Sequence, residues 1–231
     1  MALILNIDTA TEYAGVCISE GSHVLAMEES SEQKNHAAFV QSAIKKILSD
    51  GALKPTSIAA IAVTQGPGSY TGLRVGLASA KGLCYALKKP LILVNTLEVM
   101  ALAAIEEAKD KGTKTSDLLF CPMIDARRQE VFTALYNNEL QNILAAFALV
   151  LDENSFASEL ADHTIIFSGN GSIKLKELIR HKNAIFSAST HRIQHLAHLS
   201  SAAFNLNRFN DIAYSEPFYL KEFYSPAKKK I

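Results

Sequence analysis

The feature that most constrains the fold is a repeat in the order of the expected secondary-structure elements. Residues 2–8 have the apolar pattern of a buried strand, two short strands follow, and strands then alternate with helices. After a polar stretch, the same order begins again with a strand over 118–124. Both opening strands end in an aspartate, at Asp8 and at Asp125. The sequence therefore predicts an α/β protein built from two tandem halves, each a mixed sheet with helices on its faces.

The polar stretch 111–117 is the expected boundary between an N-terminal lobe, residues 1–110, and a C-terminal lobe, residues 111–231. The strands expected in the two lobes cover residues 2–8, 15–19, 23–27, 58–64, 91–95, 118–124, 130–136, 145–151, 164–167 and 184–186. The longer helices are expected over 35–49, 70–88, 96–109 and 191–207. Two such halves match the ribonuclease H-like architecture of the actin-like ATPase superfamily, where a ligand would bind in the cleft between them.

Charge and cysteine content narrow the class of protein. The chain has 231 residues with 23 basic and 23 acidic side chains, so any nucleic-acid contact must come from a local patch. Three cysteines, Cys17, Cys84 and Cys121, lie in apolar runs, which favours free thiols in a reducing cytosol. No apolar run approaches the roughly 18 residues of a membrane span, and the first residues lack the basic start of a signal peptide. We therefore expect a cytoplasmic protein without a membrane partner.

A glycine-rich turn, Gly66–Gly72, leads into a helix with almost no polar face. On a helical projection this helix carries two rows of small residues. The first row contains Gly72, Gly76, Ala80 and Cys84, and the second contains Ala78, Gly82 and Ala86. The charged residues form one narrow stripe, which contains Arg74, Lys81 and Lys88. Glycine within a helix costs about 0.5–1 kcal/mol relative to alanine, so close packing must compensate on both sides.

One small-residue row is expected to face the chain's own sheet, and the other to face either its own helices or a second protein. The helix over 35–49 also has surplus apolar surface, and two such helices can form half of an intermolecular bundle. The expected partner interface comprises Phe39, Val40, Ala43, Ile47, Tyr70, Leu73, Gly76, Leu77 and Ala80. The sequence leaves open which of the two rows faces outward.

The glycine-rich turn is a weak phosphate signal, because no Lys-Ser/Thr pair follows its last glycine as in a Walker motif. Asp8, Thr9 and Thr11 could support a phosphate contact at the end of the first strand. At the matching hairpin of the second lobe, Arg127 and Arg128 stand where glycine would be needed for close backbone approach. These residues predict at most a vestigial nucleotide or anion site.

Three histidines, His191, His195 and His198, would share one face if their segment were helical, and this spacing can chelate zinc. However, position 192 holds an arginine where a zinc peptidase would place its glutamate. No carboxylate lies close in sequence to act as a general base. A packed or solvated histidine face is therefore preferred, and no metal site is expected.

Several segments together resemble the TsaB (YeaZ) family. They are Gly66–Gly76 with Ala80–Leu83, Ile7–Thr11, and Asp125–Val131. The resemblance implies a bacterial, cytoplasmic subunit that is needed to form N6-threonylcarbamoyladenosine beside the anticodon of tRNA. It further implies pairing with the paralogous transferase TsaD through the two helices described above, association with the ATPase TsaE, and homodimers in some members. No cofactor is expected for the free chain, although ATP or ADP could bind at the interface of the complex.

The resemblance also implies that this subunit is not itself a catalyst. The catalytic relatives carry two metal-binding histidines after the strand that matches 91–95, whereas Thr96 and Met100 occupy those positions here. Threonine and methionine cannot replace two imidazoles for a hard or borderline divalent metal. Arg127 and Arg128 could instead contact tRNA or a partner. The alternative is an active enzyme of the superfamily, either an ATP-dependent small-molecule kinase or a metallopeptidase.

Overall fold

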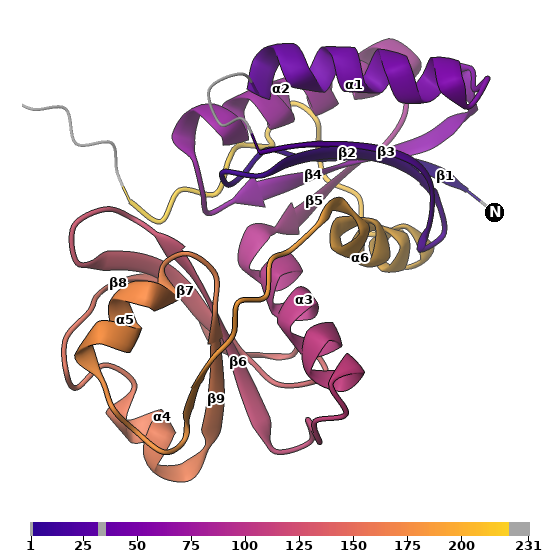
Figure 1. Ribbon diagram of the computed structural model, residues 1–231. Coiled ribbons are helices and arrows are strands. Elements are labelled where there is room, and N and C mark those ends of the chain that lie inside the picture. Colours follow the sequence, from indigo (N-terminus) through magenta and orange to yellow (C-terminus); the bar gives the residue numbers. More distant parts are fainter. Residues whose placement is uncertain (1, 32–35, 222–231) are drawn as a thin grey trace, which may run out of the picture.

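The computed structural model describes residues 2–31 and 36–221, and within them the chain forms two five-stranded sheets (Figure 1). The first sheet has the order β3-β2-β1-β4-β5 and the second β10-β9-β6-β7-β8. The strands are β1 (Leu3–Asp8), β2 (Ala14–Glu20), β3 (His23–Ser30), β4 (Ile58–Gly66), β5 (Leu91–Asn95), β6 (Leu118–Asp125), β7 (Glu130–Tyr136), β8 (Asn142–Val150), β9 (Thr164–Ser168) and β10 (Ala184–Phe186). In each sheet the opening strand pairs antiparallel with the next strand and parallel with the fourth. The prediction of two tandem mixed sheets is confirmed.

The helices also lie close to their expected positions. They are α1 (His36–Asp50), α2 (Tyr70–Leu87), α3 (Thr96–Asp110), α4 (Ala157–Asp162), α5 (Ser172–Leu178) and α6 (Ile193–Asn205), with a short 3₁₀ turn, η2, at Pro55–Ser57. Asn35, the residue at which the first of these helices was expected to begin, lies outside the described residues. Ser69 caps α2, because its hydroxyl accepts a hydrogen bond from the amide of Gly72. No helix within the described residues is long and apolar enough to cross a bilayer.

The first sheet is covered on both faces, but one cover comes from the far end of the chain. Leu5 and Ile7 point to the face that α1 and α2 cover, and together they form one buried cluster. Ile4 and Ala62 point to the opposite face, where they pack against Leu196 of α6. Figure 1 shows α6 beside the strands of the upper lobe, although it follows the second sheet in sequence.

Helix α3 makes the reciprocal contact with the second sheet. Leu97 packs with Ile124 of β6, and Ile105 packs with Phe120 of the same strand. The other face of the second sheet is covered by α4 and α5. The expected boundary at residues 110 and 111 lies between α3 and β6, yet α3 packs on the second sheet and α6 packs on the first. Each sheet has two apolar faces to bury, and the chain covers the second face of each with a helix from the other half of the sequence.

Residues 209–221, which we call the C-terminal strap, run back along the N-terminal lobe and were not predicted as an ordered segment. The amide of Asn210 donates to the carbonyl of Leu91 in β5 at 2.8 Å. Further on, the amide of Phe218 donates to the carbonyl of Gln65 in β4 at 2.7 Å. These backbone hydrogen bonds fix the strap at both ends.

The charged stripe of α2 holds the middle of the strap. Lys81 Nζ donates to the carbonyls of Ala213 and Ser215 at 3.3 and 3.0 Å. About two helical turns earlier, Arg74 Nε donates to the hydroxyl of Tyr219 at 3.0 Å. The spacing seen in the sequence thus matches a row of anchors for the chain's own C-terminal segment.

Candidate functional site

Asp8, at the end of β1, is fully buried beside the junction of the two lobes. Its Oδ1 accepts hydrogen bonds from the amide of Ala10 at 3.0 Å and from the hydroxyl of Thr64 at 2.8 Å. Its Oδ2 lies 3.1 Å from Nε2 of His191, a close contact whose geometry is poor for a hydrogen bond. Burial by itself would raise the pKa of Asp8, but His191 and the hydrogen bonds outweigh it and hold that pKa below its usual value.

The first small-residue row of α2 seals this end of β1. Thr9 Oγ1 donates to the carbonyl of Gly72 at 2.7 Å. A Cβ atom at position 76 would lie 2.5 Å from Thr9 Oγ1, and one at position 72 only 2.0 Å from the carbonyl oxygen of Thr9. A Cβ atom at position 68 would likewise lie 2.1 Å from the carbonyl oxygen of Ala10. Gly68, Gly72 and Gly76 are therefore required because α2 touches the β1–β2 connection at backbone distance.

This packing corrects part of the expected nucleotide site. Asp8 and Thr9 are fully buried and engaged by the chain's own atoms, so neither side chain faces a ligand in this structure. Thr11, the third expected contact on this side, is half-buried and does line a cavity. Sequence position alone could not separate these residues, since the inward or outward direction of each depends on α2.

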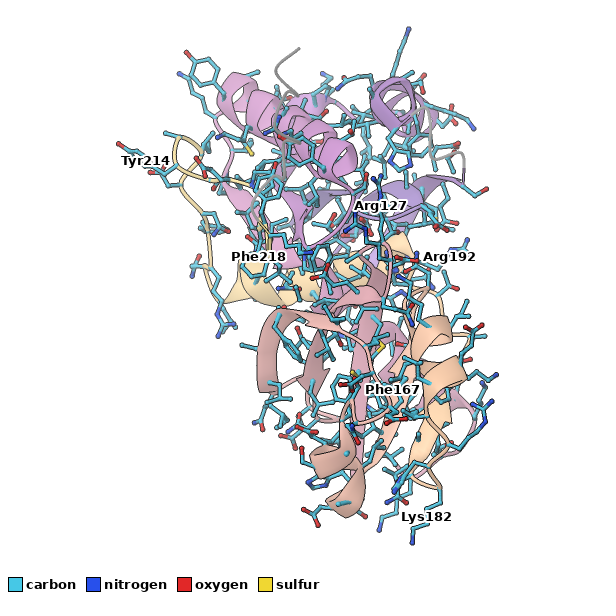
Figure 2. All side chains as sticks on the ribbon, turned by 90° about the vertical axis from the view of Figure 1, so that its left-hand side faces the viewer. Arg127, Phe167, Lys182, Arg192, Tyr214 and Phe218 are labelled. Carbon is cyan, nitrogen blue, oxygen red and sulfur yellow. The ribbon has the colours of Figure 1, made fainter. Side chains whose placement is uncertain are left out.

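Arg127 and Arg128 lie at the tip of the β6–β7 hairpin and are exposed. Both have positive φ angles, 71° and 51°, a conformation that costs a non-glycine residue of order 1 kcal/mol or more. Asp125 braces the tip, because its Oδ1 accepts from the amide of Arg127 and from Lys174 Nζ, each at 2.6 Å. The hairpin thus keeps a glycine-like backbone but presents two guanidinium groups, and Figure 2 shows Arg127 at the level of the lobe junction.

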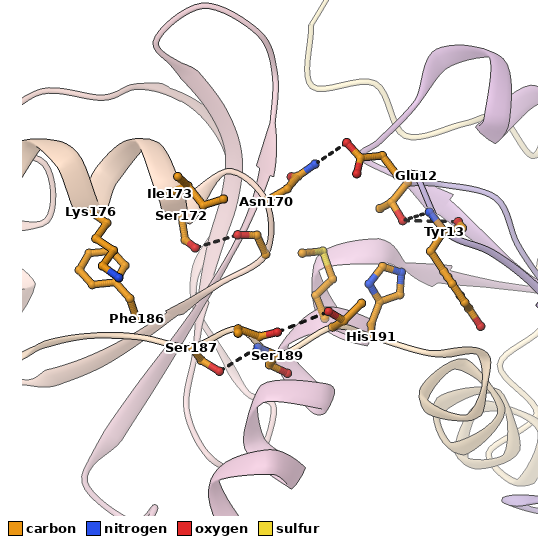
Figure 3. A pocket seen from close by; sticks show the side chains of 15 residues that line it. Glu12, Tyr13, Asn170, Ser172, Ile173, Lys176, Phe186, Ser187, Ser189 and His191 are labelled. Atoms are coloured by element: carbon orange, nitrogen blue, oxygen red, sulfur yellow. Dashed lines mark hydrogen bonds between the residues drawn. The ribbon is translucent and has the colours of Figure 1, made fainter. Parts of the chain in front are cut away.

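A cavity of about 470 Å³ lies between the lobes, within the range of about 300–1,000 Å³ for small-molecule sites (Figure 3). Its lining is Thr11, Glu12, Tyr13, Met100, Gly169, Asn170, Ser172, Ile173, Lys176, Phe186, Ser187, Ala188, Ser189, Thr190 and His191. Asn170 Nδ2 donates to Glu12 Oε1 at 3.3 Å and so joins the two lobes across it. A Cβ atom at position 169 would meet Met100 at 2.4 Å, which shows how closely this methionine fills the floor. The hydroxyl-rich wall could hold a small polar ligand.

The structure also decides which row of α2 faces outward. Most of the expected interface residues are buried in the chain's own core, namely Val40, Ala43, Ile47, Leu73, Gly76, Leu77 and Ala80. The prediction that these side chains face a partner is therefore wrong, because β1, β4 and the two helices already enclose them. Phe39 stays half-buried and Tyr70 is exposed. The second row carries the open surface, since Ala78 and Gly82 are exposed and a Cβ atom at position 82 would meet nothing within 4 Å.

The three histidines do not converge. His191 precedes α6 and turns toward Asp8, so the helical spacing assumed for it does not apply. His195 Nε2 and His198 Nδ1 approach the two oxygens of Glu106 at 3.4 and 3.3 Å. Burial lowers the pKa of His195. In residues 2–31 and 36–221, no group of three or more His, Cys, Asp or Glu side chains is placed to hold a metal ion.

Sequence reasoning missed the contribution of the C-terminal strap to the lobe junction. Lys221 forms an ion pair with Glu130 at the start of β7, so the strap also contacts the C-terminal lobe. The signal that could have revealed it was the stripe of Arg74 and Lys81, which needs acceptors on an otherwise apolar helix.

Comparison with known proteins identifies the family. The model of TsaD, tRNA N6-adenosine threonylcarbamoyltransferase, matches residues 23–228. The tRNA threonylcarbamoyladenosine biosynthesis protein TsaB of Bacillus subtilis is 30% identical over 179 residues, which cover 76% of this chain and 74% of that protein. TsaB of Escherichia coli is 35% identical over 140 residues, 61% of this chain and 57% of its own length.

The fold agrees with this match. YeaZ from Pseudomonas aeruginosa superimposes with a TM-score of 0.78 at 21% identity, over 95% of this chain and all of that one. At this level of identity the likeness shows the fold alone, and it confirms the two-lobed architecture predicted from the sequence. Since the Bacillus TsaB protein is 30% identical over about three quarters of both chains, this chain belongs to the TsaB (YeaZ) family.

Proposed function

We propose that this chain is a non-catalytic subunit needed for the formation of N6-threonylcarbamoyladenosine in tRNA, and that it works in the cytoplasm. The names of its relatives support the pathway. One observation supports the non-catalytic role: residues at the junction of the lobes are buried in the chain's own packing. Asp8 and Thr9 are sealed under α2, and Thr96 and Met100 are buried where the catalytic relatives would bind their metal.

The alternative of an active kinase or metallopeptidase is less well supported. A metallopeptidase would need a metal-binding cluster, and the described part of the chain offers no suitable group of three His, Cys, Asp or Glu side chains. A kinase would need phosphate contacts from the end of β1, where Asp8 and Thr9 are enclosed. Calorimetry with ATP and magnesium tests this alternative, because tight binding with turnover by the isolated chain would contradict the subunit role.

The partner that fits best is a TsaD-type transferase, docked on the exposed side of α1 and α2. This surface includes Ala78 and Gly82 of α2, and Gln41 Nε2 of α1 ties the helices together by donating to Ser79 Oγ at 3.2 Å. Small side chains allow two helix pairs to approach closely, and a homologous partner would offer the same kind of face. A second copy of this chain could occupy the surface when the transferase is absent.

The remaining assignments follow from this assembly. A TsaE-type ATPase would join the paired subunits, and ATP or ADP would bind at an interface of the complex. Arg127 and Arg128 are exposed on the β6–β7 hairpin, where their charge suits a phosphate of tRNA or of a nucleotide. Charge reversal of both arginines is expected to reduce tRNA modification, and unchanged modification would contradict this contact.

Reconstitution provides the direct test. The transferase, the ATPase, tRNA and threonylcarbamoyl-adenylate are combined with and without this chain, and modified adenosine is quantified. We expect modification to depend on the chain. Full modification in its absence would overturn the proposed function.

A further inference from the structure

A second cavity, of about 520 Å³, lies between the first turn of α2, strand β7 and the C-terminal strap, and we call it the strap pocket. It shares no lining residue with the cavity between the lobes. Its walls are Pro67, Gly68, Tyr70, Leu73, Arg74, Phe132, Phe218, Tyr219, Leu220 and Lys221. Figure 2 faces this side of the molecule and labels Phe218 near the junction of the lobes.

Aromatic rings dominate the strap pocket. Tyr70 and Tyr219 lie with their ring centroids 5.4 Å apart at an angle of 33°, and Phe132 and Phe218 complete the set. Tyr70, Phe218 and Tyr219 remain 37–41% exposed, so part of each side chain is open to solvent. The pocket therefore offers ring surface to a flat ligand.

Cationic groups border these rings. The guanidinium of Arg74 lies 4.0 Å from the ring centroid of Tyr70, and its Nε donates to the Tyr219 hydroxyl. Lys221 lines the pocket and pairs with Glu130 at the start of β7. The pocket lining contains two cations, Arg74 and Lys221, and no carboxylate, on a chain whose net charge is zero. This is a local patch of the kind that a neutral protein needs in order to bind a polyanion.

We propose that the strap pocket binds an unpaired nucleobase of single-stranded RNA, with a neighbouring phosphate on Arg74 and Lys221. Partly exposed aromatic rings bordered by cations are typical of single-strand recognition, whereas bases within a duplex cannot present their faces to such rings. The choice of RNA rests on the proposed function, but the ring and charge arrangement does not.

The test measures binding of a labelled single-stranded oligoribonucleotide by the full chain, using fluorescence anisotropy. Tyr219→Ala removes a ring of the pocket, and Tyr214→Ala is the matched control because Tyr214 lies on the same strap but is 86% exposed outside the pocket. Loss of one stacking ring is expected to raise Kd about 5- to 150-fold. The control is expected to bind as the wild type does, and the same RNA annealed to its complement is expected to bind more weakly.

Two further variants separate stacking from charge. Tyr219→Phe keeps the ring but removes the acceptor for Arg74, so it is expected to bind RNA nearly as well as the wild type. Arg74→Gln is expected to weaken binding and to reduce the slope of log K against log salt by about one. Thermal unfolding of each variant verifies that the fold is retained.

The proposal is overturned if Tyr219→Ala and Tyr214→Ala bind RNA equally, if the duplex binds as tightly as the single strand, or if AMP competes as well as the oligomer. Failure here is distinguishable from failure of the proposed function. If the chain supports modification but both tyrosine variants bind RNA equally, the proposed function stands and the strap-pocket proposal is wrong. If the chain binds RNA through Tyr219 but is dispensable for modification, the strap-pocket proposal stands and the proposed function is wrong.

Discussion

At the residue scale, the two glycines of α2 that differ most in their surroundings predict opposite effects of the same substitution. Gly76→Leu forces a Cβ atom against Thr9, which is held by its hydrogen bond to Gly72, so we expect the free energy of unfolding to fall by at least about 1–3 kcal/mol. Gly82→Leu meets open space and gains helix propensity, so the monomer is expected to keep or slightly increase its stability. Urea unfolding measures both changes.

The same pair of variants tests the docking surface. If the second small-residue row contacts the partner, Gly82→Leu weakens association in a pull-down or by calorimetry while the fold stays intact. Normal association of Gly82→Leu would show that the partner docks elsewhere. A Gly76→Leu variant that is as stable as the wild type would contradict the close contact between α2 and Thr9.

The buried carboxylate of Asp8 gives a prediction about pH. The pKa of Asp8 is lowered in the folded chain, so its ionised form contributes stability above the pKa of the unfolded state, about 3.9, and loses it as pH falls through the lower folded value. Asp8→Asn is expected to lower the free energy of unfolding by about 1–3 kcal/mol at pH 7, because the partners of the carboxylate lose a charged acceptor. Urea unfolding as a function of pH should show this difference constant down to about pH 5 and narrowing below about pH 4. A difference independent of pH would contradict the charged state.

At the scale of elements, the sequence predicted most strands and helices because their apolar periodicity is strong, and β5, β7 and β10 begin and end where expected. Periodicity also revealed the two small-residue rows of α2, but it could not assign them, since spacing describes angles around one helix and says nothing about its neighbours. The predicted interface residues therefore lie largely on the buried sides of α1 and α2. The strap was not predicted from the sequence, because an extended segment held by hydrogen bonds to its backbone carbonyls has no periodic pattern of its own.

The strap leads to a prediction at this scale. Lys81→Met removes the two hydrogen bonds to the carbonyls of Ala213 and Ser215, and Lys88→Met is the matched control because it changes the next lysine of the same stripe. Lys81→Met is expected to destabilise the strap by about 0.5–1.5 kcal/mol per hydrogen bond and to speed hydrogen exchange over residues 209–221. Mass spectrometry of exchanged peptides measures this. Equal exchange in the two variants would mean that Lys81 does not hold the strap.

At the scale of the whole molecule, the exchange of α3 and α6 ties the two lobes into one unit. A fragment comprising residues 1–110 would lack α6, and the face of its sheet that carries Ile4 and Ala62 would be uncovered. We expect this fragment to bind a hydrophobic dye and to show no cooperative unfolding, whereas the full chain unfolds in a single transition. A fragment with native-like exchange protection would contradict the mutual dependence of the lobes.

The return of α6 to the first sheet also has a consequence for synthesis. The ribosome completes the strands of that sheet well before it releases the helix that covers their second face, and at typical translation rates the interval is on the order of ten seconds. During this time one apolar face of the first sheet stays uncovered, because α6 has not yet been synthesised. A chaperone can bind to this uncovered face. Codon choice and chaperone supply between β6 and α6 should therefore affect the yield of soluble protein more than the same changes within the first hundred codons.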